Sequence, residues 1–351
     1  MQRFPSLVID SLIFYNDGDP SPLLDGNVTA ANLTCVNPLS GLVEAVDEMA
    51  VWLRRLSLKD TPWQLARTVA DIDEARADGK FGLIFGWQNI LPIENRLDRL
   101  ALFHALGLRV IQLSFNEASL AAHGCLEDGR FGLTRFGRDV VAEANRLGIA
   151  IDLSHCAEQV AIEASEITSR PLLITHANAS AVFNVPRNKS DEVIRAVAGT
   201  GGVIGLTIHG FMNWDGDPQN PPSLEGLIRN IRHVRDLVGI EHIGVGTDYA
   251  AVSRPGAADF FLTGVSAKYE QNAGAYLRAF GNTLECRYPA DVPTPRDYPR
   301  IFDALRKAGF AEEDIEKIAG ANFYRAFSEI WPGDAAIPPP VSTSPPPRPA
   351  A

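Results

Sequence analysis

Ionisable and amide side chains follow the ends of most of the short apolar segments in this sequence. These residues are Asp10, Gln88, Asn116, His155, His176, His209 and Asp248. Imidazole nitrogens and carboxylate oxygens bind transition metals, and the same groups move protons near neutral pH. If a fold brings these side chains to one place, the expected chemistry is metal binding, acid–base catalysis or both.

The elements that must position these residues are predicted from the pattern of apolar residues. The predicted strands cover residues 6–10, 31–36, 82–87, 109–114, 150–153, 172–175, 202–207 and 243–246. Between them lie amphipathic segments; in one, apolar residues recur every three or four positions from Leu224 to Leu237, and Gly239 ends it. A second such segment carries Val140 and Val141 on one face and ends at Gly148. Strands that alternate with helices in this way favour parallel pairing.

This alternation predicts an α/β fold, a (β/α)8 TIM barrel that forms a single domain over residues 1–333. A doubly wound open sheet is the alternative. In a barrel, the functional residues lie where each strand ends, and the polar residues named above fall at those positions. Residues 334–351 are rich in Pro and Ser, so they are predicted to be a disordered or polyproline tail.

The composition limits the class of partner. Of 351 residues, 46% are apolar and 21% are charged, which is typical of a soluble domain with a sizeable core. The net charge of −11 disfavours nucleic acid and anionic membrane as main partners. The four cysteines form no CxxC pair, which argues against a disulfide framework or a thiolate zinc site. Without a signal-like start or a long apolar run, a cytoplasmic location and no membrane contact are expected.

Three segments carry a family resemblance. They are GCLEDGRFGLTRFGRDVVAEANRLGIAIDLSH, then PLLITHANASAVFNVPRNKSDE, then HIGVGTDY. Together they resemble the membrane (renal) dipeptidase family of the amidohydrolase superfamily, and the resemblance runs over residues 7–331. It implies a hydrolase of small dipeptide-like substrates, two zinc ions in the barrel mouth, and a homodimer.

The resemblance also implies roles for individual residues. His155 in DLSH and His176 in THAN match the two histidines that hold one of the family's metals, and Asp248 in GTDY matches its catalytic-site aspartate. Arg187 in VPRN matches the arginine that binds the substrate carboxylate, a task that suits the guanidinium fork. Phe115 stands where the family often has a substrate-orienting His or Tyr. The other predicted substrate contacts are Asn116, His209 and Tyr249.

The sequence departs from the family at the remaining metal ligands. The H-x-D after the first strand is replaced by Leu12 and Phe14, and the bridging Glu is replaced by Gln88 in GWQN. Two dications about 3.5 Å apart repel by roughly 19 kcal/mol at an effective dielectric constant of 20. Negative ligands must offset that repulsion, and the residues at these positions are neutral. We therefore do not expect a binuclear zinc centre.

At most one zinc ion is expected. His155, His176 and the amide oxygen of Gln88 could provide three ligands, with water as the fourth, the open arrangement of a catalytic zinc. The same residues could instead polarise a substrate directly, with Asp248 as the proton-transfer group. In a third interpretation, the two histidines are hydrogen-bonded remnants of a former site, and Asp248 caps the next segment or pairs with Arg187. Asp10 is interpreted as structural.

The favoured function is an enzyme, a dipeptidase-like hydrolase of a small amide, dipeptide-like or amino-acid-derived carboxylate. One alternative is an inactive relative that binds a small carboxylate. Another is a metal-free enzyme that uses a His/Asp pair for lyase or isomerase chemistry. Residues 249–298, with Phe260, Phe261, Tyr269 and Tyr276, could form a lid or an oligomer contact.

Overall fold

The computed structural model describes residues 4–14, 19–213, 221–250 and 288–331. The predicted tail from residue 334 lies outside the described residues, as do Cys286 and the four aromatic residues of the predicted lid segment. In the described part of the chain, no helix combines the length and the apolar character needed to cross a membrane.

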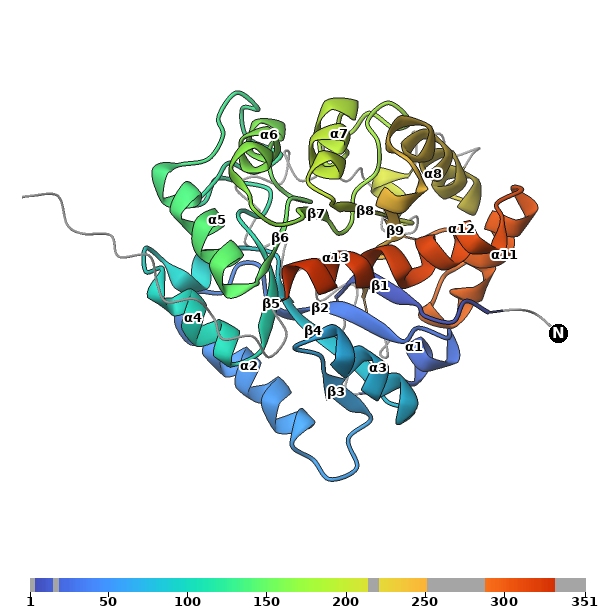
Figure 1. The fold of residues 1–351 in the computed structure, drawn as a ribbon, viewed down its shortest axis with the longest axis horizontal. Coiled ribbons are helices and arrows are strands. Elements are labelled where there is room, and N and C mark those ends of the chain that lie inside the picture. Colours follow the sequence, from blue (N-terminus) through green and yellow to red (C-terminus); the bar gives the residue numbers. More distant parts are fainter. Residues whose placement is uncertain (1–3, 15–18, 214–220, 251–287, 332–351) are drawn as a thin grey trace, which may run out of the picture.

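Parallel strands close into a barrel with helices around it (Figure 1). The hydrogen-bonded order is β1-β2-β4-β5-β6-β7-β8-β9, and β1 also pairs with β9 through Asp10 and Val245. β3 pairs with β4, and β10 pairs with β1. This confirms the (β/α)8 TIM barrel and excludes the open sheet. The strands are β1 (Ile9–Phe14), β2 (Ala30–Val36), β3 (Trp63–Leu65), β4 (Phe81–Trp87), β5 (Leu108–Gln112), β6 (Ala150–Asp152), β7 (Leu173–Ile174), β8 (Val203–Leu206), β9 (Ile243–Val245) and β10 (Tyr249–Ala250).

The prediction for the first strand was wrong at both ends. It was placed at residues 6–10, whereas β1 runs from Ile9 to Phe14 because Ile13 and Phe14 pair with β10. Leu12 and Phe14 therefore lie inside a buried strand and not in the loop after it. The short strands β3 and β10 were not predicted. Several other predicted strands extend one or two residues too far.

The helices lie outside the barrel wall. They are α1 (Ser21–Asp25), α2 (Leu42–Leu56), α3 (Val69–Ala77), α4 (Asp98–Ala105), α5 (Arg135–Leu147), α6 (Glu158–Ile167), α7 (Asp191–Gly199), α8 (Leu224–Val238), α11 (Pro299–Lys307), α12 (Glu312–Glu316) and α13 (Asn322–Ile330). Short 3-10 turns are η1 (Leu91–Ile93), η2 (Gly210–Met212), η3 (Ile240–His242) and η5 (Pro295–Asp297), and a π-helical turn, η6 (Lys317–Ala321), joins α12 to α13.

The two helices singled out by their apolar spacing are present. The Thr134 hydroxyl caps α5 by accepting from the backbone N–H of Gly137 at 3.0 Å, and Gly148 ends the helix with a φ of 72°. In α8, Leu227, Ile231 and Val234 are buried. Each helix covers the barrel with the face that the sequence pattern predicts.

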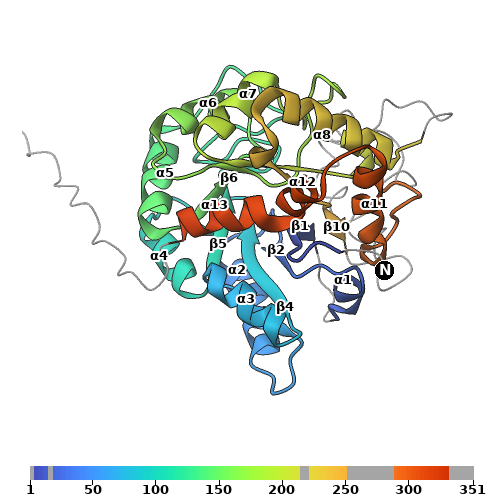
Figure 2. The same cartoon turned by 45° about the vertical axis from the view of Figure 1, so that its right-hand side comes forward.

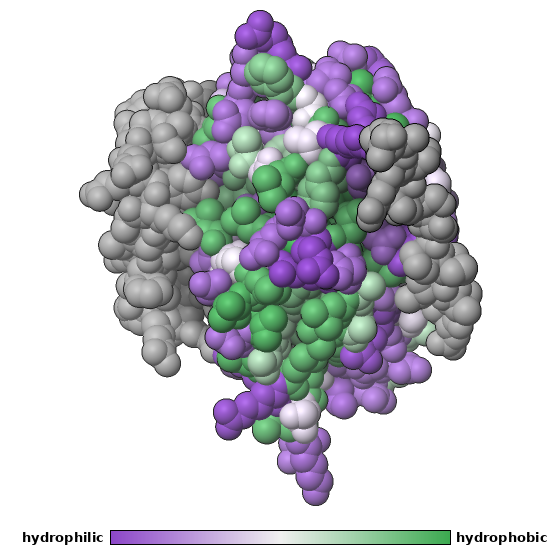
Figure 3. Space-filling view, turned by 90° about the vertical axis from the view of Figure 1, so that its left-hand side faces the viewer, coloured by the Kyte–Doolittle hydropathy of each residue, from purple (hydrophilic) through white to green (hydrophobic). Residues whose placement is uncertain are grey.

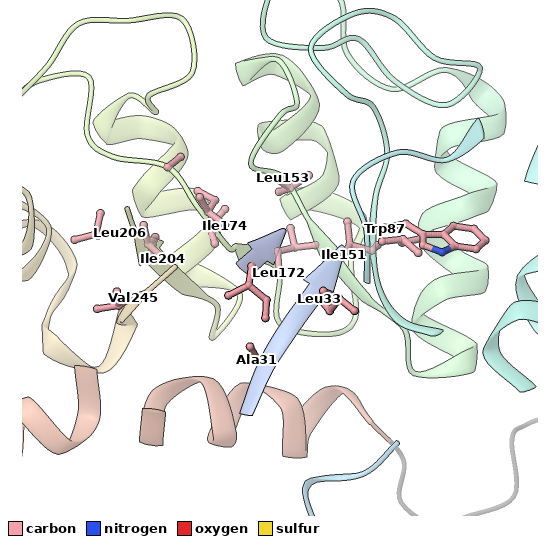
Figure 4. Close-up of a cluster of buried hydrophobic side chains, with 14 of the residues drawn as sticks. Ala31, Leu33, Trp87, Ile151, Leu153, Leu172, Ile174, Ile204, Leu206 and Val245 are labelled. Atoms are coloured by element: carbon pink, nitrogen blue, oxygen red, sulfur yellow. The ribbon is translucent and has the colours of Figure 1, made fainter. Parts of the chain in front are cut away.

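A layer of apolar side chains fills the space between the strands and the helices. Figure 4 shows part of it, with residues from several strands gathered in one cluster; its labelled members include Leu33, Ile151, Ile174, Ile204 and Leu206. These side chains are almost completely buried. The barrel wall is therefore held from outside by hydrophobic contact, which leaves its inner face available for polar residues.

A second apolar cluster closes the amino-terminal end of the barrel. The first residues of several strands, including Ile9 and Val203, pack against Phe323 and Phe327 of α13. Figures 1 and 2 show α13 lying across this part of the barrel. Since this end is filled with hydrocarbon, the polar site must lie at the opposite, carboxyl-terminal end of the strands.

The outer surface is not uniformly polar. Figure 3 shows one side of the molecule, where apolar surface lies above and below a central polar patch and further polar surface lies toward the top and bottom of the view. Among the exposed large apolar side chains, Val43, Val46 and Val51 belong to α2 and Leu102 belongs to α4.

Candidate active site

Two histidines meet at the carboxyl-terminal ends of neighbouring strands. His155 follows β6 and His176 follows β7, and their Nε2 atoms lie 3.0 Å apart. Their exposed fractions are 4% and 1%, so neither ring faces bulk solvent. The resemblance predicted that these residues act together, and the fold brings them into contact.

The other ring nitrogen of each histidine has a polar partner. The Nδ1–H of His155 donates to Asn116 Oδ1 at 2.7 Å, and the ring of Phe115 lies over His155 with centroids 4.3 Å apart. His176 Nδ1 lies 2.8 Å from the hydroxyl oxygen of Thr175. That hydroxyl donates to Asp152 Oδ2 at 2.5 Å, so it accepts from His176. These partners assign a proton to each Nδ1 and a lone pair to each Nε2.

Asp152 is the buried carboxylate behind His176. It accepts hydrogen bonds from Gln112 Nε2 at 2.6 Å and from the Ser154 hydroxyl at 2.5 Å, besides those from Thr175. Burial raises the pKa of Asp152 above its ordinary value, against the opposing effect of the hydrogen bonds from Ser154 and Thr175. Our sequence analysis missed this role of Asp152 and Thr175. The available signal was a polar residue at the end of an otherwise apolar strand.

A guanidinium group lies against the histidine pair. Arg187 Nη2 is 3.2 Å from His155 Nε2 and 3.2 Å from the backbone oxygen of His176, and Nη1 donates to the backbone oxygen of Ser154. Only 1% of Arg187 is exposed. Burial, and next the charge of Arg187, lower the pKa of both histidines well below the usual range. Both rings are therefore neutral at pH 7 and accept hydrogen bonds through Nε2.

A second buried cation, Lys189, comes from the same loop. Its Nζ donates to the backbone oxygen of Cys156 at 2.6 Å, and its exposed fraction is 1%. Burial lowers the pKa of both Arg187 and Lys189. Within the described residues, neither side chain has a carboxylate at ion-pair distance, that is, within 4.0 Å. Two buried positive charges that lack an acidic partner favour an anionic ligand. Lys189 was not among the predicted site residues.

A His/Asp pair lies on the same rim. His209 Nε2, after β8, is 3.7 Å from Asp248 Oδ2, after β9. Asp248 has a φ of 56°, the left-handed conformation that a non-glycine residue rarely adopts; its backbone N–H donates to Leu12 O, and its backbone oxygen accepts from the Tyr288 hydroxyl. The Asp248 side chain is 18% exposed. His209 is close enough to lower the pKa of both His155 and His176.

Gln88 follows β4, whereas Asp10 lies near the start of β1 and Tyr249 begins β10, and all three make contacts away from the histidine pair. Gln88 Nε2 donates to the Thr34 hydroxyl at 2.7 Å. Tyr249 is fully buried, and its hydroxyl donates to Val292 O at 2.7 Å. Asp10 accepts from the backbone N–H and the hydroxyl of Thr247 at 2.9 and 2.5 Å. These contacts hold neighbouring parts of the chain together.

The residues present do not fit the family's two zinc ions. Leu12 and Phe14 are apolar and buried in β1. In the described part of the chain, no three His, Cys, Asp or Glu residues gather as a metal site. At the two histidines, the guanidinium already provides positive charge. A dication about 4 Å from it would be repelled by roughly 8 kcal/mol at an effective dielectric constant of 20.

Comparison with known proteins places these features in context. The family model for membrane dipeptidase (peptidase family M19) matches residues 22–259. Dipeptidase verJ of Clonostachys rogersoniana is 31% identical over 268 residues, which cover 76% of this chain and 60% of that protein. Dipeptidase tcpJ of Claviceps purpurea is 24% identical, with coverages of 79% and 57%. The matched part of the chain thus spans less than two thirds of both relatives.

The fold has a counterpart of known structure. The crystal structure of an amidohydrolase from Pseudomonas aeruginosa superposes with a TM-score of 0.81 at 29% sequence identity. The match covers 93% of this chain and 97% of the other. The barrel and its covering helices are therefore similar over nearly the full length of both proteins.

Proposed function

This chain belongs to the membrane dipeptidase family, peptidase family M19, and on that premise we propose that it hydrolyses a small amide that carries a carboxylate. The substrate is dipeptide-like or derived from an amino acid, and it binds in the barrel mouth. The reaction uses at most one metal ion. The two relatives that are called dipeptidases support the reaction type.

One observation carries the proposal: two buried cations, Arg187 and Lys189, have no carboxylate partner within the described residues. A substrate carboxylate would supply the missing negative charge. The guanidinium of Arg187 suits this task because its buried Nε–H has no hydrogen-bond partner in the described part of the chain, and a guanidinium forms charge-assisted hydrogen bonds to a carboxylate.

The remaining residues have roles that follow from their contacts. Asp248, with His209 beside it, accepts a proton from water as the water oxygen attacks the amide carbonyl carbon. The same proton then passes to the leaving nitrogen as the carbon–nitrogen bond breaks. The neutral Nε2 atoms of His155 and His176 accept hydrogen bonds from the substrate or from the guanidinium.

The substrate carboxylate can be tested by a pair of matched substrates. Release of free amino acid is measured for a dipeptide and for its C-terminal amide, which lacks the carboxylate. We expect slow turnover of the dipeptide, below about 10 per second, and at least tenfold slower turnover of the amide. Arg187→Lys should remove most of this preference, because an ammonium cannot reproduce the fixed donor geometry of the guanidinium. Arg195→Lys, on the exposed face of α7, is the control.

Equal turnover of the two substrates would contradict the role of Arg187. The absence of hydrolysis with any dipeptide at high enzyme concentration would contradict the proposed reaction itself.

The second candidate is metal-free lyase or isomerase chemistry, which the 3.7 Å His209–Asp248 pair favours. Such an enzyme would exchange a carbon-bound proton of an amino-acid-derived carboxylate with solvent. Proton NMR in deuterated water distinguishes the two functions, since hydrolysis alone leaves that carbon–hydrogen signal intact.

The remaining sequence-based expectations are part of the same proposal. They are a domain over residues 1–333, a cytoplasmic location and a homodimer. Sedimentation equilibrium tests the homodimer directly.

A further inference from the structure

The Nε2 atoms of His155 and His176 have the arrangement of two ligands on one cation. Each Nδ1 has its own acceptor, Asn116 Oδ1 or the Thr175 hydroxyl, so each Nε2 presents a lone pair. Two lone pairs that face each other at 3.0 Å repel unless positive charge lies beside them. Two nitrogens on one tetrahedral zinc ion lie about 3.3 Å apart, given zinc–nitrogen bonds of about 2.05 Å. The observed spacing is close to that value.

The positive charge at this position belongs to the chain itself. Arg187 Nη2 lies 3.2 Å from His155 Nε2, and the same nitrogen reaches the backbone oxygen of His176. Nη1 donates to the backbone oxygen of Ser154. The guanidinium thus contacts the ends of both strands that carry the histidines.

The backbone that carries Arg187 is fixed by its neighbours. The next residue, Asn188, donates through Nδ2 to Phe183 O at 2.7 Å and to Met212 O at 3.0 Å. The backbone N–H of Lys189 donates to Asn178 O at 2.8 Å. The two residues that follow Arg187 are therefore held by hydrogen bonds, and the Arg187 side chain itself is 1% exposed. A side chain held in this way is a permanent part of the pocket.

We propose that the guanidinium of Arg187 is the resident cation of the His155/His176 pair and takes the place of a metal ion there. This inference rests on the proposed function only in one respect, the location of the substrate pocket at the barrel mouth. It deepens that function, because the chain would then act without any metal. The ligand expected at the guanidinium is a carboxylate, since Arg187 and Lys189 are both buried cations without an acidic partner in the described part of the chain.

Titration with cobalt(II) tests the proposal without any activity assay. Cobalt(II) binds zinc-type sites, and its visible absorption reports ligation by imidazole. Metal-stripped wild-type protein should show no stoichiometric binding. Arg187→Met removes the charge and leaves two free imidazole lone pairs, so we expect at least tenfold tighter binding of one cobalt ion. Adding His176→Ala to that variant should abolish the gain.

Three further proteins make the result decisive. Arg195→Met removes an exposed arginine of α7 and should behave like wild type. Arg187→Lys keeps the charge and should also bind no cobalt. Arg187→Gln is measured with Arg187→Met, and circular dichroism establishes that each variant is folded. Binding of one cobalt ion by wild type through His155 and His176 would overturn the proposal. It would also be overturned if folded Arg187→Met and Arg187→Gln bound cobalt no tighter than Arg195→Met.

This test separates the two proposals. If dipeptides are hydrolysed only after zinc is added, the proposed function stands and the resident cation falls. If no dipeptide is hydrolysed but cobalt binds only when Arg187 is removed, the resident cation stands and the proposed function falls.

Discussion

Single side chains around the histidine pair determine which ring nitrogen carries the proton. The Thr175 hydroxyl joins a buried carboxylate to a histidine of the candidate site, because it donates to Asp152 and accepts from His176. Through this contact the carboxylate sets which nitrogen of His176 carries the proton without touching the ring. Asn116 has the equivalent position at His155.

Replacing Thr175 tests this arrangement. Thr175→Val keeps the shape but removes the hydroxyl, so it leaves His176 Nδ1 and Asp152 Oδ2 each without one partner. We expect a loss of about 1–3 kcal/mol in the free energy of unfolding, measured with urea. Nitrogen NMR of the His176 ring should show a changed tautomer. Thr175→Ser retains the hydroxyl and should retain the tautomer; the same tautomer in the Val variant would contradict the role of Thr175.

Asp10 gives a prediction about pH. Burial raises the pKa of Asp10 to about 7 from its ordinary value of 3.8, against the opposing effect of its hydrogen bonds to Thr247. Between pH 4 and pH 7 the folded protein holds a proton that the unfolded chain has released. The contribution of Asp10 to the free energy of unfolding therefore falls as the pH rises through this window and is constant above it.

The variant Asp10→Asn cannot titrate. The difference in unfolding free energy between wild type and Asp10→Asn should decrease by up to about 4 kcal/mol from pH 4 to pH 8. Urea unfolding across this range measures it, with the exposed Asp139→Asn as the control substitution. A difference that grows with pH would contradict the raised pKa.

Part of the candidate site could be predicted from the sequence. Strand-end position and the family resemblance identified His155 and His176 as candidates, the resemblance alone identified Arg187, and the fold brings all three into contact. The guanidinium contact with the histidines could not be predicted, since it depends on the path of the loop before α7. Asp152 was missed because its partners are hydroxyl and amide groups on neighbouring strands.

The chain approaches itself closely inside the barrel at Gly205 of β8. A side chain at Gly205 of β8 would clash with the Ser11 hydroxyl and with the backbone carbonyl of Thr175. The Ser11 hydroxyl crosses the interior to donate to Thr175 O at 2.6 Å. Glycine at this position therefore allows β8 to lie beside the strand end that presents His176.

A matched pair of alanine variants tests this packing. Gly205→Ala forces backbone to move, so we expect a loss of at least about 3 kcal/mol in the free energy of unfolding. Gly199 ends α7 with no atom within 4 Å of an added Cβ. Gly199→Ala should be neutral or stabilising by about 0.5–1 kcal/mol. Thermal and urea unfolding measure both, and equal stabilities would contradict the packing argument.

Strand and helix types were predictable, and some boundaries were not. The alternation of apolar strands with amphipathic helices led to the barrel because parallel strands need crossover helices. The extension of β1 to Phe14 could not be foreseen, since its last residues pair with β10, which has two residues. All residues of β1 are buried, so no alternating pattern marked its end.

The two ends of the barrel differ, because one is closed by apolar packing and the other carries the polar residues. The site lies at the carboxyl-terminal ends of the strands, while α13 closes the other end with Phe323 and Phe327. Residues 299–330, which form α11 to α13, lie beyond the segment that the family model matches. The end that closes the barrel is thus separate from the end that carries the polar site.

Truncation of one aromatic side chain of α13 tests this division. Phe327 is fully buried and stacks on Trp331 with ring centroids 4.3 Å apart. Phe327→Ala should lower the free energy of unfolding by about 3–5 kcal/mol. In the folded protein at low temperature, affinity for the proposed substrate should remain unchanged. The exposed Ser328→Ala is the control, and a large change in affinity without loss of stability would contradict the division.

The zinc content of wild-type protein purified without chelators tests the central claim most directly. The family resemblance implies that Leu12, Phe14 and Gln88 stand at ligand positions of a two-metal centre, and we propose that Arg187 provides the positive charge at the two histidines. Elemental analysis should therefore find well under one zinc ion per chain. A value near two per chain, held after dialysis, would contradict the account.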